Sequence, residues 1–138
     1  MKIHLYLIAC MTLALGSLAP HARADEVWDT GEYQVIYQDD RLSTAIWTYD
    51  EGRGTVFIEG LAGVFEGRKS YQGYWVQESA SLRCDTYREG GDGLPSHYWG
   101  RFEITFINPD FPSHWQAKLG RCEQEPFIPL TGTPVTDF

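Results

Sequence analysis

The chain has few of the residues on which metal-binding, nucleic-acid-binding and many catalytic proteins depend. Its 138 residues include three Cys, four His and 11 Lys and Arg, against 19 Asp and Glu. The formal net charge of −8 argues against binding to nucleic acids or anionic membranes, because their phosphates attract basic surfaces. The Gly-x-Ser-x-Gly sequence of one class of serine hydrolases does not occur. We therefore expect no nucleic-acid partner, no metal and no cofactor.

Only one long apolar run is present, over residues 5–18, close to the N-terminus. Lys2 precedes it and the small-x-small sequence Ala22-Arg23-Ala24 follows it, which is the pattern of a secretory signal peptide. The run is shorter than the roughly 18 residues that a membrane-spanning helix needs. Residues 7–10 resemble a lipoprotein cleavage box, but more apolar sequence follows them, so the later site is favoured. We expect residues 1–24 to be cleaved and the protein to be exported, to the periplasm or outside the cell.

Cleavage at this site leaves two cysteines, Cys84 and Cys122, and changes the formal net charge from −8 to −10, because Lys2 and Arg23 are removed. Exported compartments are oxidising, so the two cysteines are expected to form a disulfide that closes a loop of about 38 residues. Neither thiol would then be free to act as a nucleophile. A zinc site is the alternative, but no His stands near either Cys at zinc-ligand spacing.

Alternation of apolar and polar residues, rather than helical periodicity, dominates the mature chain. It predicts short strands at residues 32–38, 42–49, 55–59, 71–77, 81–86, 97–107 and 114–122, with a candidate short strand at 63–66. Turns are expected at residues 39–41 and 50–54. Gly73, inside a strand, indicates either a bulge or the close approach of another backbone. Seven or eight strands at this spacing predict an all-β fold, a small antiparallel meander barrel or sandwich.

The barrel or sandwich is expected to span residues 31–122. Residues 25–30 would form a mobile N-terminal lead, and residues 123–138, which contain three prolines, would form an extended tail. Short strands with charged residues such as Glu103 and Lys118 on one face do not suit a lipid-facing barrel. No membrane-spanning segment is therefore expected.

The segment from residue 97 to residue 122 predicts a hairpin with a defined register. Apolar residues occupy even positions from 102 to 106 on its first strand and odd positions from 115 to 119 on its second. If the numbers of paired residues sum to 221, Phe106 faces Trp115 and Glu103 faces Lys118. A shift by one residue would place Glu103 opposite Ala117 and bury polar groups.

The size of the chain and its strand pattern resemble those of small exported meander barrels, such as the avidin-like and lipocalin-like families. Gly31-Glu32-Tyr33 opens the first strand where a Gly-x-Trp sequence opens it in those families. Arg121 lies near the last strand, as does a basic residue of lipocalins that stacks over an aromatic ring at the closed end. The chain departs from the pattern in having Tyr in place of Trp and in lacking the lipocalin helix. The resemblance covers the general shape of residues 31–122, implies a barrel and assigns no ligand.

Two histidines remain after cleavage, His97 and His114, and they flank the hairpin at opposite ends. A strand of about ten residues would separate them by about 25–30 Å, at about 3.3 Å per residue. They therefore cannot share a metal ion or relay a proton within one chain. No other group of residues shows catalytic spacing, which favours a binding protein over an enzyme.

Candidate binding residues lie at the two ends of the hairpin. Trp99 has the parity of Arg101, so on a regular strand it faces away from the core. An exposed Trp99 beside Arg101 would form a platform for a sugar ring or a peptide. Alternatively, a bulge near Gly100 or the tail at residues 127–130 covers Trp99, which is the commoner situation for a large aromatic side chain. A second candidate group lies in or beside the turn: Asp110, Phe111 and His114.

These observations predict an exported binding protein without catalytic activity. With five Trp, eight Tyr and seven Phe in the chain, its ligand could be a small apolar or sugar-like molecule held by aromatic side chains. The other candidate is a basic protein attracted by the negative charge, and an inhibitor of an enzyme such as lysozyme is one example, on charge alone. The alternative function is a structural or accessory domain of the cell envelope that contacts another protein through the proline-rich tail.

Overall fold

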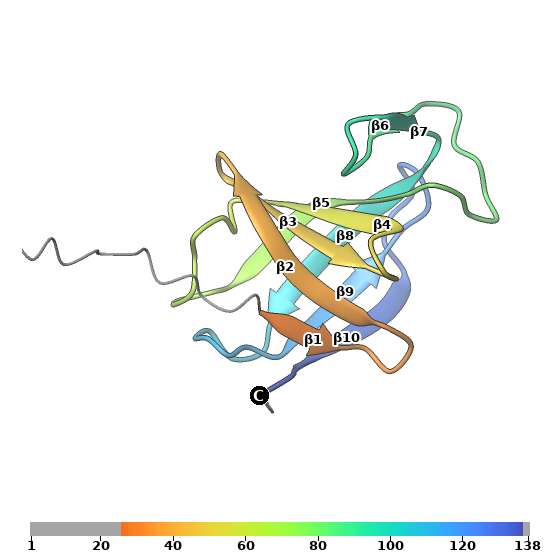
Figure 1. The fold of residues 1–138 in the computed structure, drawn as a ribbon. Helices are drawn as coiled ribbons and strands as arrows, with labels where there is room; N and C mark the ends of the chain where they lie inside the picture. The colour runs from red at the N-terminus through yellow and green to blue at the C-terminus, as the bar shows by residue number, and fades with distance from the viewer. Residues whose placement is uncertain (1–25, 137–138) are drawn as a thin grey trace, which may run out of the picture.

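The structure is a computed structural model in which residues 26–136 are described, so the signal peptide predicted for residues 1–24 lies outside them. Eight strands form a closed barrel in the order β1-β10-β9-β8-β5-β4-β3-β2, and each neighbouring pair is antiparallel (Figure 1). This confirms the all-β fold and decides for the barrel over the sandwich. No helix long and apolar enough to cross a membrane is found within the described residues. The strands of the barrel are β1 (Val27–Asp29), β2 (Gln34–Arg41), β3 (Thr44–Tyr49), β4 (Gly54–Glu59), β5 (Ser70–Gln77), β8 (Tyr98–Phe106), β9 (Trp115–Leu119) and β10 (Ile128–Pro134).

The barrel is closed by two strands from segments that the sequence assigns to a mobile lead and an extended tail. β1 pairs with both β2 and β10, and β10 also pairs with β9. The barrel therefore extends beyond residues 31–122 on both sides. Pro129 and Pro134 obscure the strand signal of β10, because proline cannot donate to a ladder and its presence argues against a strand.

Two of the expected strands do not form, and one turn is displaced. Within the described residues, neither 63–66 nor 81–86 belongs to a strand. The latter segment is held by the disulfide and by the backbone N–H of Cys84, which donates to His97 O at 2.7 Å. The prediction of a turn at residues 39–41 is wrong, because β2 continues to Arg41 and the turn is formed by Leu42 and Ser43.

Gly73 allows the backbones of β4 and β5 to approach closely. Its pairing with Ile58 is regular, and a Cβ at this position would collide with the carbonyl oxygen of Phe57. Of the two explanations offered by the sequence, the close approach is the one observed. The bulge of this sheet lies instead in β2, between Tyr37 and Asp39.

The predicted register of the hairpin is confirmed. In β8 and β9, Phe106 pairs with Trp115, and Glu103 pairs with Lys118 on the opposite face. The predicted disulfide is also present: Cys84 and Cys122 are joined, with their Cα atoms 5.6 Å apart. A buried disulfide is compatible with an exported protein.

Large aromatic side chains fill the barrel interior. Trp28, Trp47 and Trp115 are fully buried, with ring centroids 4.3 to 6.0 Å apart. Because these rings occupy the middle of the barrel, a ligand could contact only its surface or its ends. The other buried residues of this core are Val35, Tyr37, Ala45, Tyr49, Val56, Ile58, Leu61, Trp75, Phe102, Ile104, Phe106 and Ala117.

One end of the barrel, the base, is closed by a buried ion pair. Arg68 lies between β4 and β5, and its Nη1 and Nη2 donate to the two carboxylate oxygens of Glu26 at 2.9 and 2.7 Å. Arg68 Nη1 also donates to Ser113 Oγ at 3.1 Å. The rings of Phe65 and Phe106 lie 5.1 and 5.0 Å from the guanidinium carbon. The side chain of Arg68 is thus held on several sides by groups of opposite charge or π character.

Arg121 does not take the position that the resemblance to lipocalins implies. It lies over the ring of Phe127 at 5.8 Å, at the opposite end of the barrel, which we call the mouth. Arg68 is the arginine that stacks on aromatic rings at the closed end.

A second, smaller core lies outside the barrel. Residues 78–97, called the excursion, connect β5 to β8 and carry a small sheet of β6 (Arg88–Glu89) and β7 (Pro95–Ser96), which is separate from the sheet of the barrel (Figure 1). Cys84 of the excursion packs with Val76 and Trp99 on the outside of the barrel. Partly buried side chains surround this cluster: Phe57, Tyr74 and Cys122.

Candidate functional site

Two grooves lie on the outside of the barrel, between the β2–β3 turn and the excursion. The larger has a volume of about 850 Å³ and a floor that includes Ile46 and Thr55; we call it the large groove. The other, the aromatic groove, has a volume of about 540 Å³ and is lined by Phe57, Tyr74 and Trp99. Because Arg41, Val76 and Gly90 line both, the two grooves form one continuous surface, which we call the outer face.

The outer face carries many charged groups and little internal pairing. Six carboxylates and four guanidinium groups line the two grooves. Among these groups, the one ion pair within 4.0 Å joins Arg88 to Glu123 at 3.8 Å. Most of these charges are therefore available to a partner. The carboxylates are Asp39, Glu59, Glu78, Glu89, Asp92 and Glu123, and the arginines are Arg41, Arg53, Arg83 and Arg88.

Exposed apolar side chains flank the same grooves. In the described part of the chain, the three most exposed large apolar residues are Leu42 at 97%, Tyr87 at 65% and Leu94 at 63%. Leu42 follows Arg41 in the β2–β3 turn, Tyr87 lines the aromatic groove, and Leu94 lines the large groove. Leu42 also has a positive φ of 57°, in a two-residue hairpin turn where glycine, asparagine or aspartate is usual.

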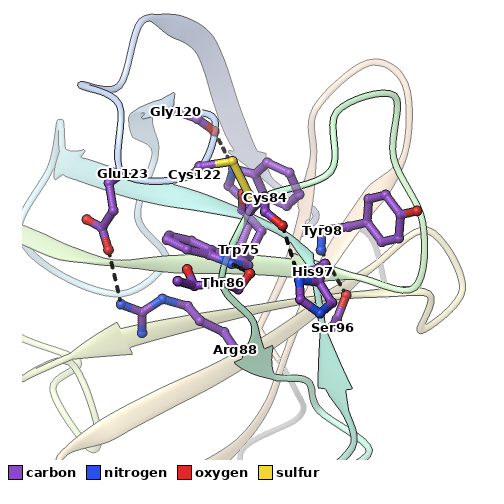
Figure 2. The surroundings of a disulfide bond; sticks show 11 residues. Trp75, Cys84, Thr86, Arg88, Ser96, His97, Tyr98, Gly120, Cys122 and Glu123 are labelled. Carbon is purple, nitrogen blue, oxygen red and sulfur yellow. Dashed lines mark hydrogen bonds and ion pairs between the residues drawn. A yellow bond between two sulfur atoms is a disulfide. The ribbon is translucent and has the colours of Figure 1, made fainter.

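The excursion is held firmly against the barrel. Figure 2 shows the Cys84–Cys122 disulfide and, at the left of the view, Arg88 reaching toward Glu123. The guanidinium carbon of Arg88 lies 3.2 Å from the ring centroid of Tyr74 and 4.8 Å from that of Trp99. A surface of this kind is pre-organised, so that little conformational entropy is lost when a partner binds.

A separate cleft of about 210 Å³ lies at the mouth of the barrel; we call it the mouth cleft. Its walls include the rings of Tyr33 and Tyr49, which stack with centroids 5.2 Å apart, and the indole of Trp75. Trp75 Nε1 donates to Gly120 O at 2.8 Å, so this indole is fixed in position (Figure 2). The mouth cleft is therefore a small site with rigid aromatic walls.

Tyr49 lines the mouth cleft, but its hydroxyl oxygen is buried away from solvent, beside the side chain of Gln77. Only 5% of Tyr49 is exposed. Burial raises the pKa of Tyr49 above its usual value of 10, and the neighbouring Gln77 side chain acts against this shift. The phenol is therefore neutral at physiological pH and able both to donate and to accept a hydrogen bond.

Trp99 and Arg101, the first pair of predicted site residues, face the outside of the barrel on β8. Trp99 is 2% exposed and its Nε1 donates to Thr86 O at 2.9 Å. It is covered, the alternative that the sequence favours, but by the excursion rather than by the tail or a bulge. Arg101 is half-buried, and its Nη2 lies 3.7 Å from Glu103 Oε1. Trp99 lines both the aromatic groove and the mouth cleft, whereas Arg101 lines neither.

Asp110, Phe111 and His114, the other predicted group, lie together near the base. Asp110 Oδ1 accepts from the backbone N–H of Gly67 at 3.1 Å, and the ring of Phe111 meets that of Phe65 at 6.3 Å. The His114 backbone N–H donates to Asn108 Oδ1 at 2.6 Å. The structure therefore brings these three residues together and separates them from Trp99, which lies toward the opposite end of the hairpin.

Sequence reasoning missed Leu42, Tyr87, Leu94 and Tyr49. A signal existed for Leu42, because an apolar residue in a short polar turn is unusual. The exposure of Tyr87 and Leu94 depends on how the excursion folds over the barrel, and no local pattern encodes it. The burial of the Tyr49 hydroxyl likewise becomes visible only when the neighbouring strands are placed.

Within residues 26–136, no group of three or more His, Cys, Asp or Glu side chains is arranged to hold a metal ion. In comparisons with known proteins, the chain matches no family model, no curated protein and no solved structure.

Proposed function

We propose that the protein is an exported binding protein, periplasmic or secreted, whose outer face docks a basic protein partner. The observation that carries this proposal is Leu42, whose side chain is almost fully exposed and whose backbone has a positive φ. A leucine in this position adds both backbone strain and exposed apolar surface. Contact with a partner would offset the cost of the exposed apolar surface and would account for leucine at this position.

The charge of the protein supports a basic partner. The formal net charge is −8 for the whole chain, and carboxylates outnumber arginines on the outer face by six to four. Charges that lack internal partners steer an oppositely charged protein toward the surface and select its orientation. Tyr87 and the four arginines also belong to the residue types that are enriched at protein interfaces.

The variant Leu42→Gly tests the proposal. Glycine adopts a positive φ without strain, so the melting temperature should stay the same or rise. Affinity for a basic protein, with purified lysozyme as the probe, should fall about tenfold because an apolar anchor is lost. Calorimetric titration at about 0.05 M and 0.3 M salt should show weaker binding at the higher concentration, as expected for charge-dependent association.

A matched control is Ile107→Gly, which removes an exposed apolar side chain near the base. It should leave the affinity unchanged. The proposal would be contradicted if the wild-type protein showed no salt-sensitive binding, or if Leu42→Gly bound as tightly as the wild type.

A further inference from the structure

The two grooves of the outer face differ in charge. Three carboxylates and three guanidinium groups line the large groove, so its charges balance. Three carboxylates but only two guanidinium groups line the aromatic groove, and one of these two, on Arg41, is shared with the large groove. The excess negative charge of the outer face therefore lies in the aromatic groove. Its charged residues are Glu59, Glu89, Glu123, Arg41 and Arg88.

One arginine of the aromatic groove already has partners within the protein. The guanidinium carbon of Arg88 lies 3.2 Å from the ring centroid of Tyr74, and its Nη2 lies 3.8 Å from Glu123 Oε1 (Figure 2). In the described part of the chain, by contrast, Glu59 and Glu89 have neither an ion pair within 4.0 Å nor a side-chain hydrogen bond. Both residues are exposed. Two carboxylates of the groove are therefore open to a cation from outside.

Aromatic side chains make up much of the remaining lining of this groove. Phe57 and Tyr74 are half-buried on the outer side of the barrel, and Tyr87 is 65% exposed. A lysine or arginine side chain matches this lining, because its aliphatic stem packs on apolar surface while its charged end stays at a polar rim. An acidic side chain would be repelled by the three carboxylates, and a neutral one would gain nothing from them.

We propose that the aromatic groove receives one basic side chain, a lysine or an arginine, of the protein that docks on the outer face. This inference rests on the proposed function and assigns one contact within it. The stem of the side chain packs on Phe57 and Tyr87, and its charged end pairs with Glu59 on the barrel and Glu89 on the excursion. The groove volume of about 540 Å³ lies within the roughly 300–1,000 Å³ of small-ligand sites, which is sufficient for one side chain.

The experiment is a titration of the oxidised protein with three blocked tripeptides, in which the residue between two glycines is arginine, lysine or citrulline. Citrulline has the shape of arginine without its charge. The indole N–H resonance of Trp99 reports on the groove, because Trp99 lines it and its Nε1 donates to Thr86 O at 2.9 Å. The arginine or the lysine peptide should shift this resonance in a saturable way that weakens with salt, and the citrulline peptide should not. The two basic peptides show which of the two side chains fits.

The double variant Glu59→Gln/Glu89→Gln should weaken the peptide that binds by about tenfold, because two exposed ion pairs are lost. The matched control is Glu78→Gln/Asp92→Asn, which removes two carboxylates from the large groove and should change the affinity by less than about twofold. All four residues are exposed, and none forms an ion pair in the described structure, so both variants should melt like the wild type. The same contrast should appear with lysozyme as the ligand.

Three results would each overturn this inference: no saturable shift by either basic peptide, an equal shift by the citrulline peptide, or equal losses of affinity in the two double variants. If lysozyme still bound in a salt-sensitive way that depended on Leu42, the docking proposal would survive them. A charge-dependent peptide shift without any binding of lysozyme would have the opposite meaning. It would retain the site for a basic side chain and contradict the docking.

Discussion

At the scale of single residues, the most constrained position is Arg68. Its side chain is fully buried, and Glu26 supplies the carboxylate that balances its charge at 2.7 Å. A buried cation that loses its partner keeps the cost of desolvation without the compensating attraction. Cleavage after Ala24 would retain Glu26 in the mature protein, as the base of the barrel requires.

Glu26→Gln should reduce the free energy of unfolding by about 3–5 kcal/mol, because it leaves the Arg68 charge buried and uncompensated. Urea denaturation followed by tryptophan fluorescence would measure the loss. The control is Glu103→Gln, which breaks the partly exposed pair with Arg101 at 3.7 Å and should cost about 0–1 kcal/mol. Losses of similar size in the two variants would show that the buried pair has no special role.

At the scale of elements, the sequence predicts those parts of the fold whose partners are close along the chain. The β8–β9 hairpin has a short turn and a clear alternation, so that a single register satisfies both its faces. The pairing of β1 with β10 joins the two ends of the described chain, and neither segment has a pattern that identifies its partner.

The same limit applies to the candidate sites. The outer face and the mouth cleft both include residues of the excursion, whose position depends on the disulfide and on packing over Trp99.

Deleting residues 123–138 should open the barrel, because it removes β10 and leaves both β9 and β1 without a neighbour on that side. We expect the truncated protein to lose cooperative thermal unfolding, as followed by near-ultraviolet circular dichroism, and to aggregate through its unpaired strand edges. Deleting only residues 137 and 138 is the control. It retains the hydrogen bond from the Val135 backbone N–H to Val27 O and should unfold like the full-length protein. Cooperative unfolding of the longer deletion would mean that residues 123–136 are a dispensable tail, as the sequence alone suggests.

At the scale of the whole molecule, the filled interior separates the scaffold from the surfaces that could bind a partner. The aromatic core and the buried ion pair stabilise the barrel, while the outer face and the mouth cleft remain accessible. This division makes it possible to change either candidate site without removing a side chain of the central tryptophan cluster. Many buried groups then contribute to the stability of the barrel. Three buried or half-buried tyrosines allow their contribution to be measured by varying the pH.

The pKa values of Tyr33, Tyr37 and Tyr49 are all raised above 10 in the folded protein, in each case mainly by burial. The hydrogen bond from the Tyr37 hydroxyl to Asp40 raises the pKa of that phenol further. In the unfolded chain the same phenols ionise near pH 10, so at higher pH the unfolded state binds fewer protons than the folded state. Their contribution to stability is therefore fully present below about pH 10 and is lost as the pH rises through the folded-state pKa values.

The free energy of unfolding should accordingly show no pH dependence from these groups near pH 8, and it should fall above about pH 10. Urea denaturation at a series of alkaline pH values, together with ultraviolet absorbance of tyrosinate, would measure both the loss and the ionisation. Tyr49→Phe should make the decline shallower, because one phenol that resists ionisation has been removed. A stability that stayed constant above pH 10, or a decline equally steep in Tyr49→Phe, would show that these hydroxyl groups are not shielded from solvent in the folded barrel.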